Sequence, residues 1–351
     1  MYTLLYFKKL YMKKKKFIIF NDVHIKSNNE DNVYEGVKYL VEYANKNDIK
    51  EIVLNGDIFD SRSFQRLSHL KCFERILDLF KANDILCHTN VGNHDRTKYD
   101  SEDNFIEPFK YHPAIKLYSN IADIKVAGMD VTISPYFTNK ILYKQLAEHK
   151  GGKLLIGHWS CDGSSHLGHS PESPINKKLL SKWGKVYLGH YHNYQEVNNT
   201  TTHLPSLLQN DFGEDDKKGF AVIYDDQSYE IIGGKFRRFK KVVIDLNKKS
   251  IDYVNDLIKV EQNSSNVVRF EFTGEDTKLK SLDKNLFSNT GIDVKLKYDK
   301  KYDFDNDSKT PLIVEQYGKK DIESEFKTFC NNKGYDYEFG STLLKQFFDD
   351  K

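Results

Sequence analysis

Five short apolar runs along the chain are each followed at once by a cluster of polar residues. Short continuous apolar runs bounded by Gly or Asn are typical of strands that are buried on both faces. We therefore predict five buried strands, each of which delivers a polar cluster to its carboxyl end. The runs lie at 17–20, 52–54, 85–91, 154–156 and 186–188.

Helical patterns separate the first three of these runs. Apolar residues recur at helical spacing from Val33 to Ala44 and again from Phe64 to Phe80. The alternation of strand and helix predicts βαβ units and a parallel sheet. In such sheets the functional site forms outside the carboxyl ends of the strands, which is where all five polar clusters fall.

The remaining chain indicates further elements and a division into parts. We predict a hairpin at 121–137, strands at 219–224 and 240–246, a strand–helix–strand unit at 267–298, and helices around 322–329 and 343–348. Because Met12 stands just ahead of the first strand, residues 1–12 are interpreted as an extension or a mis-assigned start. The predicted parts are this extension (1–12), a main α/β domain (13–246), a small α+β domain with linkers (247–310) and a helical tail (311–351).

The polar clusters supply the side chains that divalent metals bind. Carboxylate, imidazole and amide ligands suit ions from Mn²⁺ to Zn²⁺, and one aspartate can bridge two ions about 3.5–4 Å apart. Taken singly, each cluster also fits an ordinary turn or a helix cap. Their meeting at one sheet edge favours a metal site. The residues are Asp22, His24, Asp57, Asp60, Asn93, His94, Asp95, His158, His190 and His192.

The amino-acid composition excludes several classes of protein but does not indicate a specific function. The 53 Lys and Arg against 51 Asp and Glu leave a net charge of +2, which excludes a wholly basic nucleic-acid-binding protein. The four cysteines are far apart in sequence and favour a reducing compartment over a disulfide scaffold. No apolar run is long enough to cross a bilayer, and the N-terminal lysines follow the first apolar stretch instead of preceding it, unlike in a signal peptide. We expect a cytoplasmic protein, in the host cytoplasm if the source is viral.

The order of the motifs resembles that of a known superfamily. They read D-x-H at 22–24, G-D-x-x-D at 56–60, G-N-H-D at 92–95, G-H at 157–158 and G-H-x-H at 189–192. This order resembles the calcineurin-like metallophosphoesterase superfamily. The resemblance implies a four-layer αββα fold, a β-sandwich flanked by helices, and an enzyme with two divalent ions, Mn²⁺ being expected and Mg²⁺ or another ion the alternative.

The resemblance also implies a role for each motif residue. His94 would act at the scissile phosphate, as general acid or as charge stabiliser, and Asp95 would orient it. Many nuclease relatives have a histidine where this chain has Asp60, so Asp60 is expected to orient a neighbour or, with Arg62, to contact substrate. One ion would be bound by Asp22, His24 and His192, the other by Asn93, His158 and His190, with Asp57 bridging the two.

Two further stretches are similar to the nuclease branch of this superfamily. The run 56–62, Gly-Asp-Ile-Phe-Asp-Ser-Arg, and the stretch 204–220, which contains Glu214 and Lys218, resemble SbcD-type recombination nucleases, above all the recombination endonuclease subunits of T-even bacteriophages. Pro205 stands where that family has glycine. The resemblance implies 3′→5′ exonuclease action on duplex DNA and endonuclease action on single strands. A stand-alone nucleotide phosphodiesterase or phosphoprotein phosphatase, and a non-enzymatic DNA-end scaffold, are the alternatives.

The nuclease resemblance also implies partners. These are DNA, an SMC-like ATPase of SbcC type, and a second copy of the chain packed against the helix from Phe64 to Phe80. That helix could instead be buried within one subunit. The tail at 311–351 would dock on the ATPase, or would serve as a structural cap.

Overall fold

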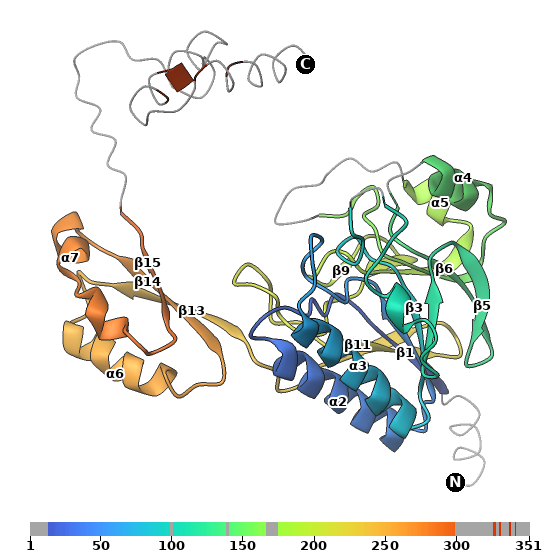
Figure 1. Cartoon of the computed structure of the whole chain (residues 1–351), viewed down its shortest axis with the longest axis horizontal. Coiled ribbons are helices and arrows are strands. Elements are labelled where there is room, and N and C mark those ends of the chain that lie inside the picture. The colour runs from blue at the N-terminus through green and yellow to red at the C-terminus, as the bar shows by residue number, and fades with distance from the viewer. Residues whose placement is uncertain are drawn as a thin grey trace, which may run out of the picture. The chain divides into compact units, whose positions relative to one another are not determined.

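The computed structural model describes residues 13–98, 101–137, 140–165 and 175–298, with the single positions 326, 327, 330, 337 and 341. Within these residues the chain forms two six-stranded sheets and one three-stranded sheet (Figure 1). The predicted extension at 1–12 lies outside the described residues. So do the predicted tail helices at 322–329 and 343–348, apart from positions 326 and 327.

The first sheet has the strand order β12-β11-β1-β2-β3-β4. Its strands β1 to β4 run parallel, whereas β11 is antiparallel to β1. Helices α2 and α3 connect β1 to β2 and β2 to β3, and they lie side by side (Figure 1). The elements are β1 (Lys15–Phe20), α2 (Glu30–Lys46), β2 (Glu51–Asn55), α3 (Leu67–Ala82), β3 (Leu86–Asn90), the short helix η1 (Glu107–Phe109), β4 (Ile115–Tyr118), β11 (Phe220–Tyr224) and β12 (Tyr229–Ile232).

The second sheet has the strand order β5-β6-β7-β8-β10-β9. Strands β5 and β6 form the predicted hairpin, and β6, β7, β8 and β10 run parallel. Its elements are β5 (Ala122–Val126), β6 (Met129–Ser134), α4 (Lys140–Glu148), β7 (Gly152–Gly157), α5 (Lys177–Leu180), β8 (Trp183–Leu188), β9 (Gln195–Glu196) and β10 (Thr201–His203).

The side chains of β1 show how the layers are stacked. Ile18 and Phe20 pack in the core that contains the apolar faces of α2 and α3. Phe17 and Ile19 point the other way, into a core shared with Ile156 of β7. Alternation along a strand sends successive side chains to opposite faces, so β1 is buried on both. Helices α4 and α5 pack in a further core against β7 and β8, so the helix–sheet–sheet–helix stack confirms the predicted fold class.

Helix α3 begins later than its apolar pattern predicted. Arg66 has an extended backbone (ψ 152°), so the helix begins at Leu67, and Phe64 lies before it. The side chains of Phe73 and Phe80, on the inner face of the helix, are fully buried, whereas Phe64 and Leu67 are 59% and 67% exposed. The expected helix over 64–80 is therefore corrected at its start, and its first apolar side chains face away from the core.

A small parallel sheet follows the two large ones. Strand β13 pairs with β14 and β14 with β15, and a core containing Val254, Phe270 and Leu279 lies between this sheet and its helices. Strand β13 was predicted to lie in the main domain, which was expected to end at residue 246, but it pairs with β14 and belongs to the small sheet. The single helix predicted within the strand–helix–strand unit at 267–298 is interrupted at Leu282, which has an extended backbone. The elements are β13 (Phe239–Asp245), α6 (Ile251–Glu261), β14 (Val267–Thr273), α7 (Asp276–Ser281), η2 (Lys284–Phe287) and β15 (Asp293–Leu296).

Two further observations bear on the predictions from composition. Among the helices that the structure describes, none combines the length and apolarity needed to span a membrane. All four cysteines are buried free thiols.

Candidate metal centre

The five polar clusters meet at one edge of the sandwich, as the strand pattern predicted. Asp22 and His24 follow β1, Asp57 follows β2, and Asn93 follows β3, all in the first sheet. His158 follows β7, while His190 and His192 follow β8, in the second sheet. Backbone hydrogen bonds tie the loops together: Asp22 N donates to Gly56 O and Gly189 N donates to Gly157 O. The site is therefore built from both sheets.

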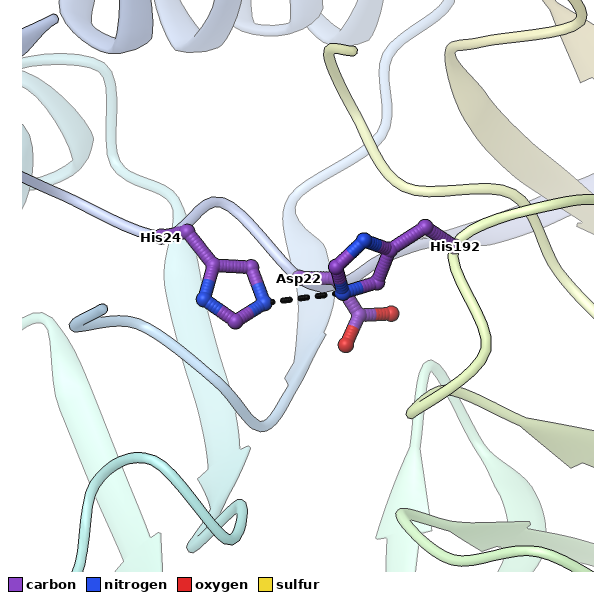
Figure 2. Close-up of side chains that lie close together, drawn as sticks. All are labelled: Asp22, His24 and His192. Carbon is purple, nitrogen blue, oxygen red and sulfur yellow. Dashed lines mark hydrogen bonds between the residues drawn. The ribbon is translucent and has the colours of Figure 1, made fainter. Parts of the chain in front are cut away.

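Asp22, His24 and His192 form the first group of ligands. One donor atom from each lies within 4.8 Å of the others. Figure 2 shows the two imidazole rings pointing toward one another beside the Asp22 carboxylate. His24 Nε2 and His192 Nε2 are 3.0 Å apart, so a proton or a cation is required between their lone pairs. This arrangement fits one divalent ion.

Asp57, His158 and His190 form a second group with the same spacing. His158 Nε2 lies 3.2 Å from Asp57 Oδ2. The same carboxylate oxygen lies 3.6 Å from His24 Nε2 of the first group. Asp57 thus stands between the two groups, where a carboxylate would have to lie to bridge two ions.

The Asn93 amide tests whether the second group suits a cation. Its Oδ1 lies 2.8 Å from His190 Nδ1 and 3.3 Å from Asp57 Oδ2, so it faces two acceptors. Turned over, the amide nitrogen would donate to both atoms, and Oδ1 would accept from Arg62 at 2.6 Å. An asparagine amide can present either its oxygen or its nitrogen, and with Oδ1 turned to the site the donor set of oxygen and imidazole suits a divalent metal. The residues therefore fit the implied ions.

The backbone at the ligands adopts a conformation that most residues avoid. Asp22, His24, Asp57 and His190 have φ values of 53°, 45°, 50° and 80°. Non-glycine residues at positive φ are uncommon and concentrate at functional sites. Here the left-handed residues turn the chain sharply at the strand ends, so consecutive side chains of one loop enter the same site.

Close approach of the loops explains two of the motif glycines. A Cβ atom on Gly56 would lie 2.6 Å from Cγ of His158, and one on Gly92 would lie 2.2 Å from the Asp57 nitrogen. Neither position can carry a side chain without moving a ligand. The glycines are therefore needed for packing of the ligand loops against each other.

The residue that orients His94 differs from the expected one. His94 Nδ1 donates to the carbonyl oxygen of Asp60 at 2.6 Å. The Asp95 carboxylate instead accepts from the backbone nitrogens of Ile58, Phe59 and Gly92, at 2.8–3.1 Å. Asp95 therefore holds two ligand loops together. The prediction that its carboxylate orients the His94 imidazole was wrong, because the backbone carbonyl of Asp60 makes that contact.

Other groups fix the rings of two predicted ligands. His158 Nδ1 donates to Asn55 O at 2.6 Å, and His192 Nδ1 lies 2.6 Å from Glu214 Oε1. Such contacts select the tautomer that leaves Nε2 free for a metal. His24 Nδ1 lies 3.5 Å from the Asp60 carboxylate without a hydrogen bond to it, so the orienting role considered for Asp60 stays a prediction. Sequence reasoning quoted Glu214 only as part of a family stretch and gave it no role.

Burial and charge set the protonation of the groups. Burial alone would lower the pKa of His158, but Asp57 and Asp22 raise it to about 9. Burial and the neighbouring His158 lower the pKa of His190 to about 3. Burial would raise the pKa of Glu214, but His192 and Lys218 lower it to about 2. Without metal, the site thus holds a proton where a cation would sit.

A pocket of about 360 Å³ opens onto the site. Its walls include the Arg62 guanidinium, the His94 imidazole and the predicted metal ligand His192, so all three face the same opening. Arg62 lies within reach of the Asn93 amide. A larger groove of about 950 Å³ lies between α2 and the segment 233–238 and contains none of the predicted ligands.

Comparison with known proteins agrees with this geometry. The profile of the family described as calcineurin-like phosphoesterase matches residues 15–225, which contain every residue of the site. The chain is 25% identical over 170 residues to exonuclease subunit 1 of Enterobacteria phage T4, a match that covers 47% of this chain and 50% of the phage protein. The chain thus matches about half the length of that relative.

A nuclease MPE of Pseudomonas putida was found among solved structures. The match has a TM-score of 0.27 and 14% sequence identity, and it covers 51% of this chain and 63% of that one. A likeness at this level does not contribute to the assignment.

Proposed function

Because this chain belongs to the calcineurin-like phosphoesterase family, as its five motifs predicted, we propose that it is a Mn²⁺-dependent DNA nuclease of the SbcD type. It would act as a 3′→5′ exonuclease on duplex DNA and as an endonuclease on single strands, during recombination and break-end processing. One observation carries the proposal: two groups of metal ligands converge on Asp57 beside a pocket that contains Arg62 and His94. The similarity to a phage exonuclease subunit favours DNA among phosphoesters.

The chain's own residues supply positioning and proton transfer. Two divalent ions would polarise the phosphate and lower the pKa of a bound water. With Nδ1–H held by the Asp60 carbonyl, His94 has Nε2 left to carry a proton to the leaving sugar oxygen. The Arg62 guanidinium on the pocket wall is suited to bind a phosphate oxygen.

The test is cleavage of a linear duplex by purified protein with Mn²⁺. His94→Ala should abolish cleavage and leave the metal content intact, because His94 is not among the proposed ligands and all of these are unchanged. His112→Ala is the matched control, since His112 lies away from the site and contacts Asp78. Unchanged cleavage by the His94 variant would exclude this residue from the reaction.

The runner-up is a stand-alone phosphodiesterase or phosphatase, which the same metal centre would serve. It would hydrolyse a small phosphodiester such as bis-p-nitrophenyl phosphate faster than DNA, and it would not need residues 250–351. Comparison of the two substrates with one preparation separates the proposals.

We further propose that the nuclease works with partners. Phe64 and Leu67, exposed at the start of α3, support a second copy of the chain as one partner. The T4 relative is described as a subunit, which supports an assembly with a further protein, here proposed to be an SMC-like ATPase. Co-purification of a coiled-coil ATPase with the full chain would support this part.

A further inference from the structure

A buried lysine and a buried glutamate lie behind His192. Lys218 is 2% exposed, and its Nζ donates to the His192 carbonyl at 2.7 Å and to Asn193 Oδ1 at 3.1 Å. The same Nζ lies 3.0 Å from Glu214 Oε2. The other oxygen of Glu214 contacts His192 Nδ1 at 2.6 Å. An ammonium group, a carboxylate and an imidazole therefore form a continuous chain that ends at the candidate metal centre.

Both oxygens of Glu214 have assigned donors. Oε2 accepts from Lys218 Nζ and from the Asn210 backbone nitrogen at 3.0 Å, which leaves Oε1 to face His192 Nδ1. A carboxylate only accepts, so Nδ1 must carry the proton and Nε2 must present its lone pair. His192 Nε2 is the atom that points toward His24 in Figure 2.

Two other predicted imidazole ligands, His158 and His24, lack this arrangement. His158 is oriented by a backbone carbonyl, and the Asp60 side chain near His24 is 39% exposed and 3.5 Å away. The Glu214 side chain is 5% exposed and the Lys218 side chain is fully buried. An uncompensated charge would be costly here, so the buried pair is maintained as a unit.

We propose that Glu214 is the positioning residue for His192, and that Lys218 holds Glu214 in place for this task. The inference rests on the proposed two-metal centre and assigns control of the ion bound by Asp22, His24 and His192 to these two side chains. Contacts of this kind to metal ligands contribute about 10–100-fold to metal affinity. The other ion, at Asn93, His158 and His190, would not depend on Glu214.

Glu214→Gln tests this role more sharply than a truncation. The donors Lys218 Nζ and Asn210 N would hold the amide oxygen of the new glutamine on their side. Its NH₂ group would then face His192 Nδ1, which would have to accept, so the proton would move to Nε2, the atom proposed as ligand. The substitution conserves the shape of the side chain, but it removes the negative charge that faces Lys218 together with the correct tautomer of His192.

The experiment is a titration of metal-free full-length protein with Mn²⁺, followed by electron paramagnetic resonance of the free ion. The parent should bind two ions. Glu214→Gln should bind one ion about 10–100-fold more weakly and the other as the parent does. Lys218→Met should weaken the same ion. Asp216→Asn is the control, because its exposed side chain lies in the same loop and accepts from Gln209 Nε2, a bond that asparagine keeps.

Thermal unfolding of the metal-free proteins separates positioning from simple folding. Loss of affinity at one site alone supports the proposal, because the partial unfolding that an unpaired Lys218 charge favours would weaken both sites. Parental affinity at both sites in Glu214→Gln, or an equal loss at both, would overturn it while leaving the two-metal centre standing. A parent that binds fewer than two ions would overturn the proposed centre itself, and the role of Glu214 with it.

Discussion

The two halves of the candidate metal centre are held in different ways. In the first half, the imidazoles of His24 and His192 lie against the side-chain carboxylates of Asp60 and Glu214. In the second half, His158 is fully buried and bonds to a backbone carbonyl. Side-chain supports can be changed by single substitutions, whereas a main-chain support cannot. The first half is therefore the part of the site that sequence change can tune, and the second half is fixed by the fold.

The two halves form one centre only if they share a residue. Substitution of Asp57, the carboxylate between them, tests whether they do. Asp57→Asn keeps a side chain that tolerates the left-handed backbone and can still accept from the His94 nitrogen, but it removes the charge between the groups. We expect the number of bound Mn²⁺ ions to fall from two to none, with complete loss of cleavage. Elemental analysis after gel filtration measures this, with Asp216→Asn as control. Retention of one tightly bound ion would mean that the halves are independent.

The second half should be the more sensitive to acid. His203 on β10 donates from Nδ1 to Gly189 O at 3.0 Å, directly before His190, and its Nε2 faces Ser164 Oγ. Burial lowers the pKa of His203 to about 4. The unfolded chain binds a proton below about pH 6.5 and the folded chain only below about pH 4, so stability should fall across this interval by up to ~3 kcal/mol.

Urea unfolding at pH 7 and pH 4.5 measures this loss. In His203→Asn the amide retains a donor for the Gly189 carbonyl and cannot take up a proton, so the pH dependence should shrink by the contribution of this histidine. An identical dependence in parent and variant would show that His203 does not limit stability in acid.

The smallest effect is expected at the weaker support of the first half. Asp60 Oδ1 is shared between His24 Nδ1 at 3.5 Å and Lys26 Nζ at 3.2 Å, and the side chain is 39% exposed. Exposed pairs contribute about 0.2–1 kcal/mol, so Asp60→Asn should weaken one Mn²⁺ ion only about 2–5-fold. The Mn²⁺ titration described for Glu214 measures it. An effect as large as that of Glu214→Gln would remove the distinction drawn between buried and exposed supports.

The strands and the convergence of the polar clusters could be predicted from the sequence. The apolar runs at 17–20, 52–54, 85–91, 154–156 and 186–188 overlap β1, β2, β3, β7 and β8, because a strand buried on both faces favours continuous apolar residues. Strand β3 departs from this pattern, since its buried residues include His88, Thr89 and Asn90. The parallel arrangement then brought Asp22, Asp57 and Asn93 to one edge. The assignment of two stacked sheets, however, depended on the family resemblance, since local pattern does not reveal which sheet a strand joins.

The supports of the site could not be predicted in the same way. His94 and His158 are oriented by the carbonyls of Asp60 and Asn55, and every residue has a carbonyl, so no letter of the sequence marks these contacts. Glu214 lies 22 positions from His192, and only the folded loop brings the two together. The start of α3 was missed because Phe64 continues the apolar spacing although Arg66 is extended.

The origin of the ligands from both sheets has a mechanical consequence. Asp22, His24, Asp57 and Asn93 extend from one layer, and His158, His190 and His192 from the other. Ions bound at this rim would act as clasps that fasten the layers of the sandwich to each other. Removal of the ions by a chelator would therefore remove a link between the two sheets as well as the reactive centre. The unfolding temperature should then be restored even by ions that do not support catalysis.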